Sequence, residues 1–144
     1  MTGPIVCATR GGKACHHTQG RAIALAQENS AELIFLFVAD PSFAGPTDER
    51  LEAALKDELA RLGRSLLYIA RERAREQGLE AQTVVRDGPV GESIEAYVQE
   101  VNASALIIGT PQAASTYRAF SDQTLDDFAS AVEKATGVPV IIVD

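Results

Sequence analysis

Short runs of apolar, mostly β-branched residues alternate along the whole chain with longer stretches that have the spacing of amphipathic helices. The runs occupy residues 5–9, 33–39, 82–86, 105–109 and 139–143. The second, fourth and fifth runs are apolar at nearly every position, which is typical of strands covered on both faces. This alternation predicts a parallel sheet with right-handed crossovers, and hence a three-layer α/β sandwich of five strands and four helices.

The stretch from Asp48 to Gln77 has the clearest helical pattern. Its apolar residues recur at steps of three or four opposite a charged face, so they form the predicted buried stripe: Leu51, Leu55, Leu59, Leu62, Leu66, Ile69 and Ala70. Gly63 lies in the middle of this helix, where glycine costs about 1 kcal/mol relative to alanine, so a kink or close packing is expected there. Gly78 and Gly137 are expected to end the second and fourth helices.

Signals for the beginnings of the last two helices are also present. Pro89 suits the first turn of the third helix, with Asp87 or Gly88 as its cap. The fourth helix is expected over residues 124–136, and two aspartates in its first turn lie near the positive end of the helix dipole.

Composition bounds the class of protein. The 144 residues, 46% hydrophobic and 23% charged, suit one domain over residues 1–144 that folds without disulfides or metals. A net charge of -7 disfavours a nonspecific nucleic-acid or anionic-membrane partner. No apolar run approaches the ~20 residues that cross a bilayer, and residues 1–12 carry no signal-peptide core. With Cys7 and Cys15 as its two cysteines, the protein is expected to be cytoplasmic.

Four strand-and-turn stretches have a distinctive order and spacing. They read AELIFLFV at 31–38, VVRDGP at 84–89, ALIIGT at 105–110 and GVPVIIV at 137–143. Together they resemble the universal stress protein family over essentially the whole chain. The resemblance implies a Rossmann-like parallel sheet in the order 3-2-1-4-5 with two helices on each face. It also implies dimerisation through the last strand and, in some members, a nucleotide at the carboxyl ends of strands one and four.

The loop after strand four departs from the ATP-binding members of that family, which carry a Gly-x2-Gly-x9-Gly-Ser/Thr phosphate loop. Gly109 and Thr110 match its start, but Gln112 replaces the second glycine. The third glycine is replaced by Asp122 or, counted back from the last strand, by the aspartates at 126–127. A carboxylate repels phosphate, so the usual grip on a triphosphate is expected to be absent.

The loop after strand one departs as well, because the ATP-binding members carry an aspartate where this chain reads Thr9-Arg10-Gly11-Gly12-Lys13. In an open α/β sheet, ligands bind at the switch point between strands one and four. The glycines permit a nest of N–H groups, and Arg10 and Lys13 can neutralise a phosphate. We therefore expect this loop to have taken over anion binding, the alternative being a turn with solvated charges.

The candidate ligands are AMP, ADP, ATP or another small anion, held between these two loops with the backbone of strand two beside a base. The expected lining residues are Thr9, Arg10, Gly11, Gly12, Lys13, Val38, Ala39, Gly88, Gly109, Thr110 and Gln112. The polar segment from Pro111 to Gln123 carries side chains that either stack on a base or pack against the domain: Tyr117, Arg118 and Phe120.

Cys15, His16 and His17 invite a metal-site interpretation. Adjacent side chains on a helix point about 100° apart, so three neighbours do not converge on one ion. Cys7 lies within the first strand and is expected to be a buried thiol. We therefore expect neither a metal site nor a catalytic residue.

The last strand, from Val138 to Val143, is apolar throughout and is expected at the edge of the sheet, with only Asp144 after it. An unpaired apolar edge is an aggregation liability, and antiparallel pairing with a second copy about a two-fold axis removes it. We therefore expect a homodimer through this strand.

These patterns favour a regulatory or ligand-sensing module of the universal stress type over an enzyme. One alternative is a nucleotide-hydrolysing or nucleotidyl-transferring enzyme of the same superfamily, although the SGGxDS and HxGH motifs of its branches are missing from the sequence. The other alternative is a structural dimer without a ligand.

Overall fold

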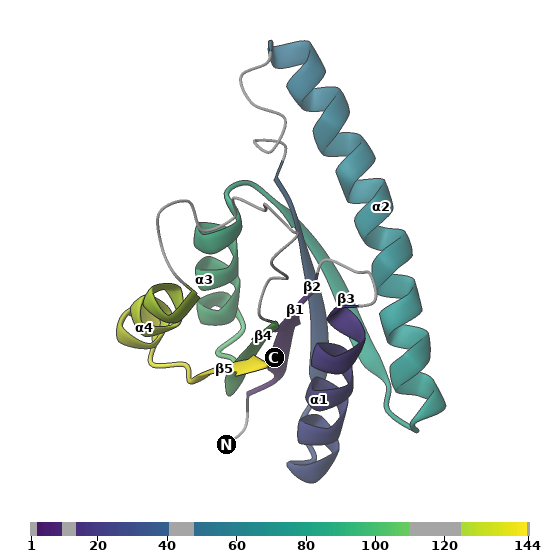
Figure 1. The fold of residues 1–144 in the computed structure, drawn as a ribbon, viewed down its shortest axis with the longest axis vertical. Helices are drawn as coiled ribbons and strands as arrows, with labels where there is room; N and C mark the ends of the chain where they lie inside the picture. The colour runs from purple at the N-terminus through teal and green to yellow at the C-terminus, as the bar shows by residue number, and fades with distance from the viewer. Residues whose placement is uncertain (1–2, 10–13, 41–47, 110–124, 144) are drawn as a thin grey trace.

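The computed structural model describes residues 3–9, 14–40, 48–109 and 125–143. Strands and helices alternate along the chain (Figure 1). The strands are β1 (Ile5–Ala8), β2 (Leu33–Ala39), β3 (Ala81–Asp87), β4 (Ala105–Gly109) and β5 (Val140–Val143). The helices are α1 (Ala14–Glu28), α2 (Glu49–Glu76), α3 (Val90–Glu100) and α4 (Leu125–Thr136). Each predicted strand is present, with its ends within one residue of the predicted ones.

The five strands form one parallel sheet in the order β3-β2-β1-β4-β5, which confirms the predicted order. α1 and α2 cover one face, and α3 and α4 cover the other (Figure 1). The predicted three-layer sandwich with two helices on each face is therefore confirmed. None of the described helices is both long and apolar enough to cross a bilayer.

β2 shows why the strand signal in the sequence is so strong. All seven of its residues are buried, because helices cover both faces of the sheet. Leu33, Phe35 and Phe37 pack toward α1 and α2, whereas Ile34 and Leu36 pack toward α3 and α4. A strand with a core on each side has no position for a polar side chain, so its sequence reads as one apolar run.

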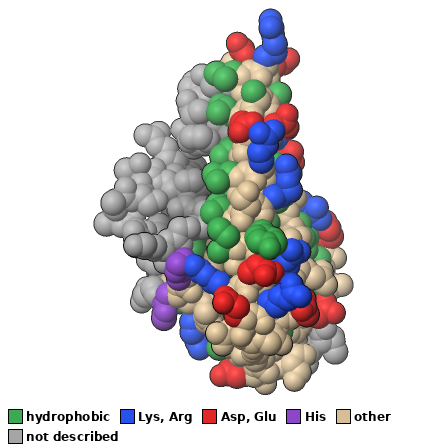
Figure 2. Space-filling view, turned by 90° about the vertical axis from the view of Figure 1, so that its right-hand side faces the viewer, with side chains coloured by type: hydrophobic (Ala, Val, Ile, Leu, Met, Phe, Trp, Pro, Cys, Tyr) green, Lys and Arg blue, Asp and Glu red, His purple; other side chains and the backbone are tan. Residues whose placement is uncertain are grey.

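α2 has the predicted ends but presents a different face to the sheet. The carboxylate of Asp48 accepts a hydrogen bond from the N–H of Leu51 at 2.9 Å, and Gly78, with a φ of +84°, follows the last turn. The buried residues of the helix are Gly63, Leu67, Ala70 and Ala74. Leu51 is 50% exposed, and Leu62 and Ile69 are each 51% exposed. Figure 2 shows apolar side chains lined up along the outside of this helix, with charged ones beside them.

The prediction that the whole leucine stripe faces the sheet is therefore wrong. Of that stripe, Ala70 lies inside the core, and Leu59 and Leu66 pack at its margin. Gly63 and Ala74 extend the buried face along a line of small residues, which lets the backbone of α2 lie close to β2 and β3. The prediction relied on the positions of large apolar side chains, whereas the buried face of this helix consists mostly of small residues.

The start of α3 also differs from the prediction, since Pro89 occupies the N-cap position and no side chain caps the helix. Asp87 is still part of β3, where it pairs with Ala39, and its carboxylate lies 3.5 Å from the Lys56 ammonium. Gly88 has a φ of +120°, and its N–H donates to the carbonyl of Ala39 at 3.1 Å. Neither predicted cap is available, because the strand and its turn engage both residues.

Candidate functional site

The strand order reverses between β1 and β4, because β2 and β3 are added on one side of β1 whereas β4 and β5 are added on the other. The carboxyl ends of β1 and β4 lie side by side (Figure 1). Cys7 pairs with Ile107, so Thr9 and Gly109 come level two residues further on. The helix that follows β1 covers one face of the sheet, and the helix that follows β4 covers the other. Diverging crossovers of this kind are expected to leave a crevice at the strand ends, the usual ligand position in open α/β sheets.

Thr9 directly follows β1 and begins a chain of polar contacts that runs from the core to the surface. It is 3% exposed, and its N–H donates to the carbonyl of Leu36 at 2.9 Å. Its Oγ1 accepts a hydrogen bond from Nε2 of Gln19 on α1 at 3.0 Å. Oε1 of Gln19 in turn accepts from Nη1 of Arg73 on α2 at 3.0 Å, and Nη2 of Arg73 contacts Nε2 of His16. This Thr9–Gln19–Arg73 chain ties the end of β1 to both helices on that face.

Gln19 and Arg73 were not among the site residues predicted from the sequence. Gln19 and Thr18 are each 3% exposed, although both are polar, and they precede the buried Ala22 and Ile23 by one helical turn. The position of these two polar residues on the apolar face of the helix was the feature of the sequence that could have indicated a buried polar contact. No feature of the sequence indicated the role of Arg73, because its partner Gln19 is 54 positions away in the chain.

Thr9→Val is expected to destabilise the fold by about 1–3 kcal/mol, because it leaves the buried amide of Gln19 without its acceptor. Thr9→Ser keeps the hydroxyl and is the matched control. Urea unfolding followed by circular dichroism measures both. Equal stability of the two variants would show that the hydroxyl contributes little.

Gly109 is the last residue of β4, and its close contact with α1 explains why this position holds a glycine. A Cβ at this position would lie 2.5 Å from Oγ1 of Thr18, which α1 places against the end of β4. The residue that matches the start of the family's phosphate loop therefore also permits α1 to pack closely on β4.

Val38, Ala39 and Gly88 lie together at the ends of β2 and β3. Ala8 pairs with Leu36, so β2 extends further toward the crevice than β1 does. Val38 is 9% exposed and the side chain of Ala39 is fully buried, on opposite faces of the sheet. The carbonyl of Ala39 already accepts a hydrogen bond from the N–H of Gly88. The role of these three residues as the wall beside a base stays a prediction.

The remaining predicted site residues lie outside the part of the chain that the structure describes. They are Arg10, Gly11, Gly12, Lys13, Thr110 and Gln112. The segment from Pro111 to Gln123 lies outside it as well. The two aspartates at 126–127 are in the first turn of α4, where the helix dipole stabilises them.

The sequence model of the universal stress protein family matches residues 1–144. The chain belongs to this family. No curated protein sequence matches it closely enough to serve as a relative.

Solved universal stress protein structures share the fold. Universal stress protein UspA from Lactobacillus plantarum is 18% identical, with a TM-score of 0.75 over 100% of this chain and 99% of that one. The protein from Archaeoglobus fulgidus in complex with dAMP is 19% identical, with a TM-score of 0.64 over 98% and 97%. A universal stress protein in complex with cAMP is 22% identical, with a TM-score of 0.69 over 100% and 99%.

The thiols and imidazoles of this universal stress protein do not gather into a further site. Cys7 is fully buried, as predicted, and burial raises the pKa of its thiol. A thiolate is the reactive form, so Cys7 is inert. Cys15 is partly exposed, and His16 and His17 are exposed. Within residues 3–9, 14–40, 48–109 and 125–143, no three His, Cys, Asp or Glu side chains are grouped to hold a metal ion.

Proposed function

We propose that this universal stress protein is a regulatory, ligand-sensing module that binds an adenine nucleotide at the carboxyl ends of β1 and β4. The observation that carries the proposal is that Thr9 and Gly109 both lie two residues beyond the Cys7–Ile107 pair, at the switch point of the sheet. The Thr9–Gln19–Arg73 chain holds one wall of this crevice in place before any ligand arrives, which lowers the entropy cost of binding.

A nucleoside monophosphate is the preferred ligand in this proposal. Two structures that share the fold were solved with dAMP and with cAMP, and each of these nucleotides has a single phosphate group. This chain has Gln112 in place of the second glycine of the family's triphosphate loop, and Asp122 or the aspartates at 126–127 in place of the third. A single phosphate needs fewer N–H donors than a triphosphate, and Arg10 and Lys13 supply its countercharge.

Calorimetric titration with AMP, ADP and ATP tests the proposal. We expect AMP to bind more tightly than ATP, and Arg10→Ala to weaken AMP binding by about tenfold through loss of a charge-assisted hydrogen bond. Arg21→Ala, which removes a charge from the exposed side of α1, is the matched control and should leave binding unchanged. Absence of nucleotide binding by the wild-type protein would refute the site, and equal AMP binding by wild type and Arg10→Ala would refute the role of the loop.

The proposed module has no turnover of its own and works in the cytoplasm. Incubation with ATP under the same conditions, with phosphate release as the readout, separates it from a hydrolase of the same superfamily. Phosphate release above the level of a Thr9→Val preparation would support the enzyme instead.

The protein is further proposed to be a homodimer that pairs through Val138 to Val143. β5 is an edge strand of the sheet, and the side chains of Val140, Ile141 and Ile142 are each only partly buried in the single chain. Antiparallel pairing with a second copy would cover these side chains and the free edge together.

A further inference from the structure

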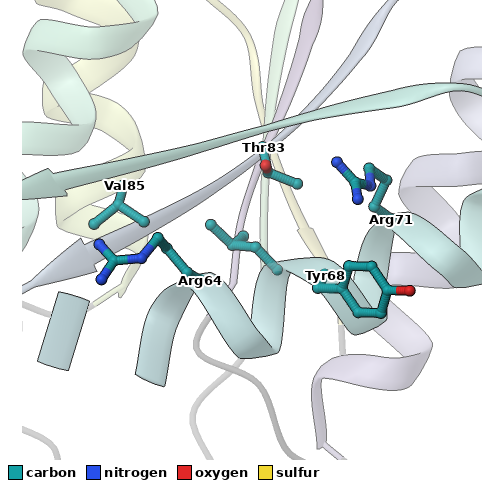
Figure 3. A pocket seen from close by; sticks show the side chains of 6 residues that line it. Arg64, Tyr68, Arg71, Thr83 and Val85 are labelled. Atoms are coloured by element: carbon teal, nitrogen blue, oxygen red, sulfur yellow. The ribbon is translucent and has the colours of Figure 1, made fainter. Parts of the chain in front are cut away.

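A hollow of about 310 Å³ opens between α2 and the edge strand β3 (Figure 3). Its lining consists of Arg64, Leu67, Tyr68, Arg71, Thr83 and Val85. Arg71 and Arg73 are two positions apart on the helix and so point to opposite sides of it. The hollow is therefore separate from the crevice at the ends of β1 and β4, which Arg73 supports.

The floor of the hollow is apolar. Leu67 is 1% exposed and belongs to the main core between α2 and the sheet. Thr83 and Val85 are two positions apart on β3, so both lie on the face of the strand that points to α2. Both are partly buried. This floor can receive a small apolar or aromatic group, while the Thr83 hydroxyl adds one polar contact.

Two arginines border this floor. Arg64 and Arg71 are seven residues apart on α2, or about 10 Å along the helix axis. In Figure 3 the guanidinium of Arg64 lies on the Val85 side of the hollow and that of Arg71 lies on the Thr83 side. Both ends of the hollow therefore carry a positive charge.

The chain has 20 aspartates and glutamates, but within the described residues neither arginine has an acidic partner. Other basic side chains nearby pair with carboxylates at 2.9–3.7 Å: Lys56, Arg61, Arg75 and Arg86. Among the described residues, no carboxylate lies within 4.0 Å of Arg64 or Arg71. On the helix, the residues three and four positions from Arg64 and from Arg71 include no aspartate or glutamate. Two of these neighbouring residues, Arg61 and Arg75, are themselves basic. The charge of Arg64 and Arg71 is thus left available to a bound anion.

Tyr68 holds one of the two guanidiniums in place. The guanidinium carbon of Arg71 lies 5.3 Å from the centre of the Tyr68 ring, a cation–π arrangement. A guanidinium carries five N–H donors in a planar fork that suits a planar anion such as a carboxylate.

We propose that this hollow, the Arg64–Arg71 pocket, binds a small amphipathic organic anion, with an apolar body on Leu67 and Val85 and a carboxylate, sulfonate or phosphate on one of the two arginines. Its volume is at the lower end of the ~300–1,000 Å³ of ligand pockets, so the ligand is small. The pocket is independent of the proposed nucleotide site and is occupied whether or not a nucleotide is bound.

A titration with 2-naphthoate followed by proton–nitrogen correlation NMR tests this pocket. We expect saturable shifts of the Thr83 and Val85 amide signals, and the same shifts with AMP present. The single carboxylate of 2-naphthoate can contact only one of the two guanidiniums at a time. One of Arg64→Gln and Arg71→Gln should therefore weaken binding by about fivefold to tenfold, through loss of that charge-assisted contact, and the other should weaken it less. Arg75→Gln removes the same charge from the same helix outside the pocket and should change affinity less than ~2-fold.

Two further ligands separate the parts of the proposal. 2-Naphthalenemethanol lacks the charge and acetate lacks the apolar body, so each should bind about tenfold more weakly than 2-naphthoate. Shifts centred on Leu51, Leu62 and Ile69 would overturn the pocket in favour of nonspecific adsorption on the exposed leucines. Equal affinity of Arg64→Gln, Arg71→Gln and Arg75→Gln would overturn the role of the two arginines.

Discussion

Replacing Gly63 with alanine is expected to lower the free energy of unfolding by about 2 kcal/mol, although alanine is the better helix former. A Cβ at Gly63 would lie 2.7 Å from Cε1 and 2.8 Å from Cγ of Phe37, and closer still to Cδ1. Phe37 is 6% exposed in the core, so its ring has little room to move. Overpacking of this severity costs about 3 kcal/mol, and the gain in helix propensity returns about 1 kcal/mol.

Gly20→Ala is the matched control for this substitution. Gly20 lies in the middle of α1, and a Cβ there would meet no atom within 4 Å. The same change should therefore stabilise the protein by about 1 kcal/mol. In thermal unfolding, Gly63→Ala should lower Tm by about 4–8 °C while Gly20→Ala raises it. In a Phe37→Leu background, Gly63→Ala should cost less, and a stabilising effect of Gly63→Ala in the wild-type background would contradict the packing argument.

Placing a glutamate at Ile141 is expected to convert the proposed dimer into a monomer. Ile141 is in β5 and is only partly buried in the single chain. In an antiparallel pair of Val138 to Val143 segments, the two copies of residue 141 lie near the two-fold axis, so two carboxylates would be brought together. Like charges in that position and the desolvation of each carboxylate should weaken the dimer by at least ~100-fold.

Light scattering on a size-exclusion column measures this effect at micromolar concentration. Gln82→Glu is the matched control, because it adds one charge to an exposed position of β3, at the opposite edge of the sheet. It should leave the dimer intact. A monomeric wild type would refute the homodimer. A dimer that survives Ile141→Glu, with circular dichroism showing a folded chain, would refute pairing through β5.

Strands were easier to predict than the packing of helices on them. The run at 33–39 is apolar because both faces of β2 are covered, so its burial follows from local sequence alone. The buried face of α2 depends on how closely Gly63 of this helix approaches Phe37 of β2. The two residues are far apart in the chain, so the spacing of residues within the helix does not reveal this contact. For the same reason the leucine stripe gave the wrong rotation of the helix.

The candidate site shows a similar division. Its place between Thr9 and Gly109 follows from the strand order, which the family resemblance implied. Its support by Gln19 and Arg73 depends on where α2 lies against α1, which the sequence does not encode locally. The Arg64–Arg71 pocket depends on the same rotation of α2.

The length of α2 divides the molecule into two parts of unequal stability. Its 28 residues span about 42 Å, whereas the seven residues of β3 beside it span about 23 Å. No residue of this helix before Gly63 is buried, and its first turns project past the sheet in Figure 1. An isolated helix of fewer than about 12–15 residues is marginal in water, so we expect this half to open and reclose without global unfolding. We expect amide protons there to exchange with solvent by fraying, and those around Leu67 and Ala70 to exchange only when the whole domain opens.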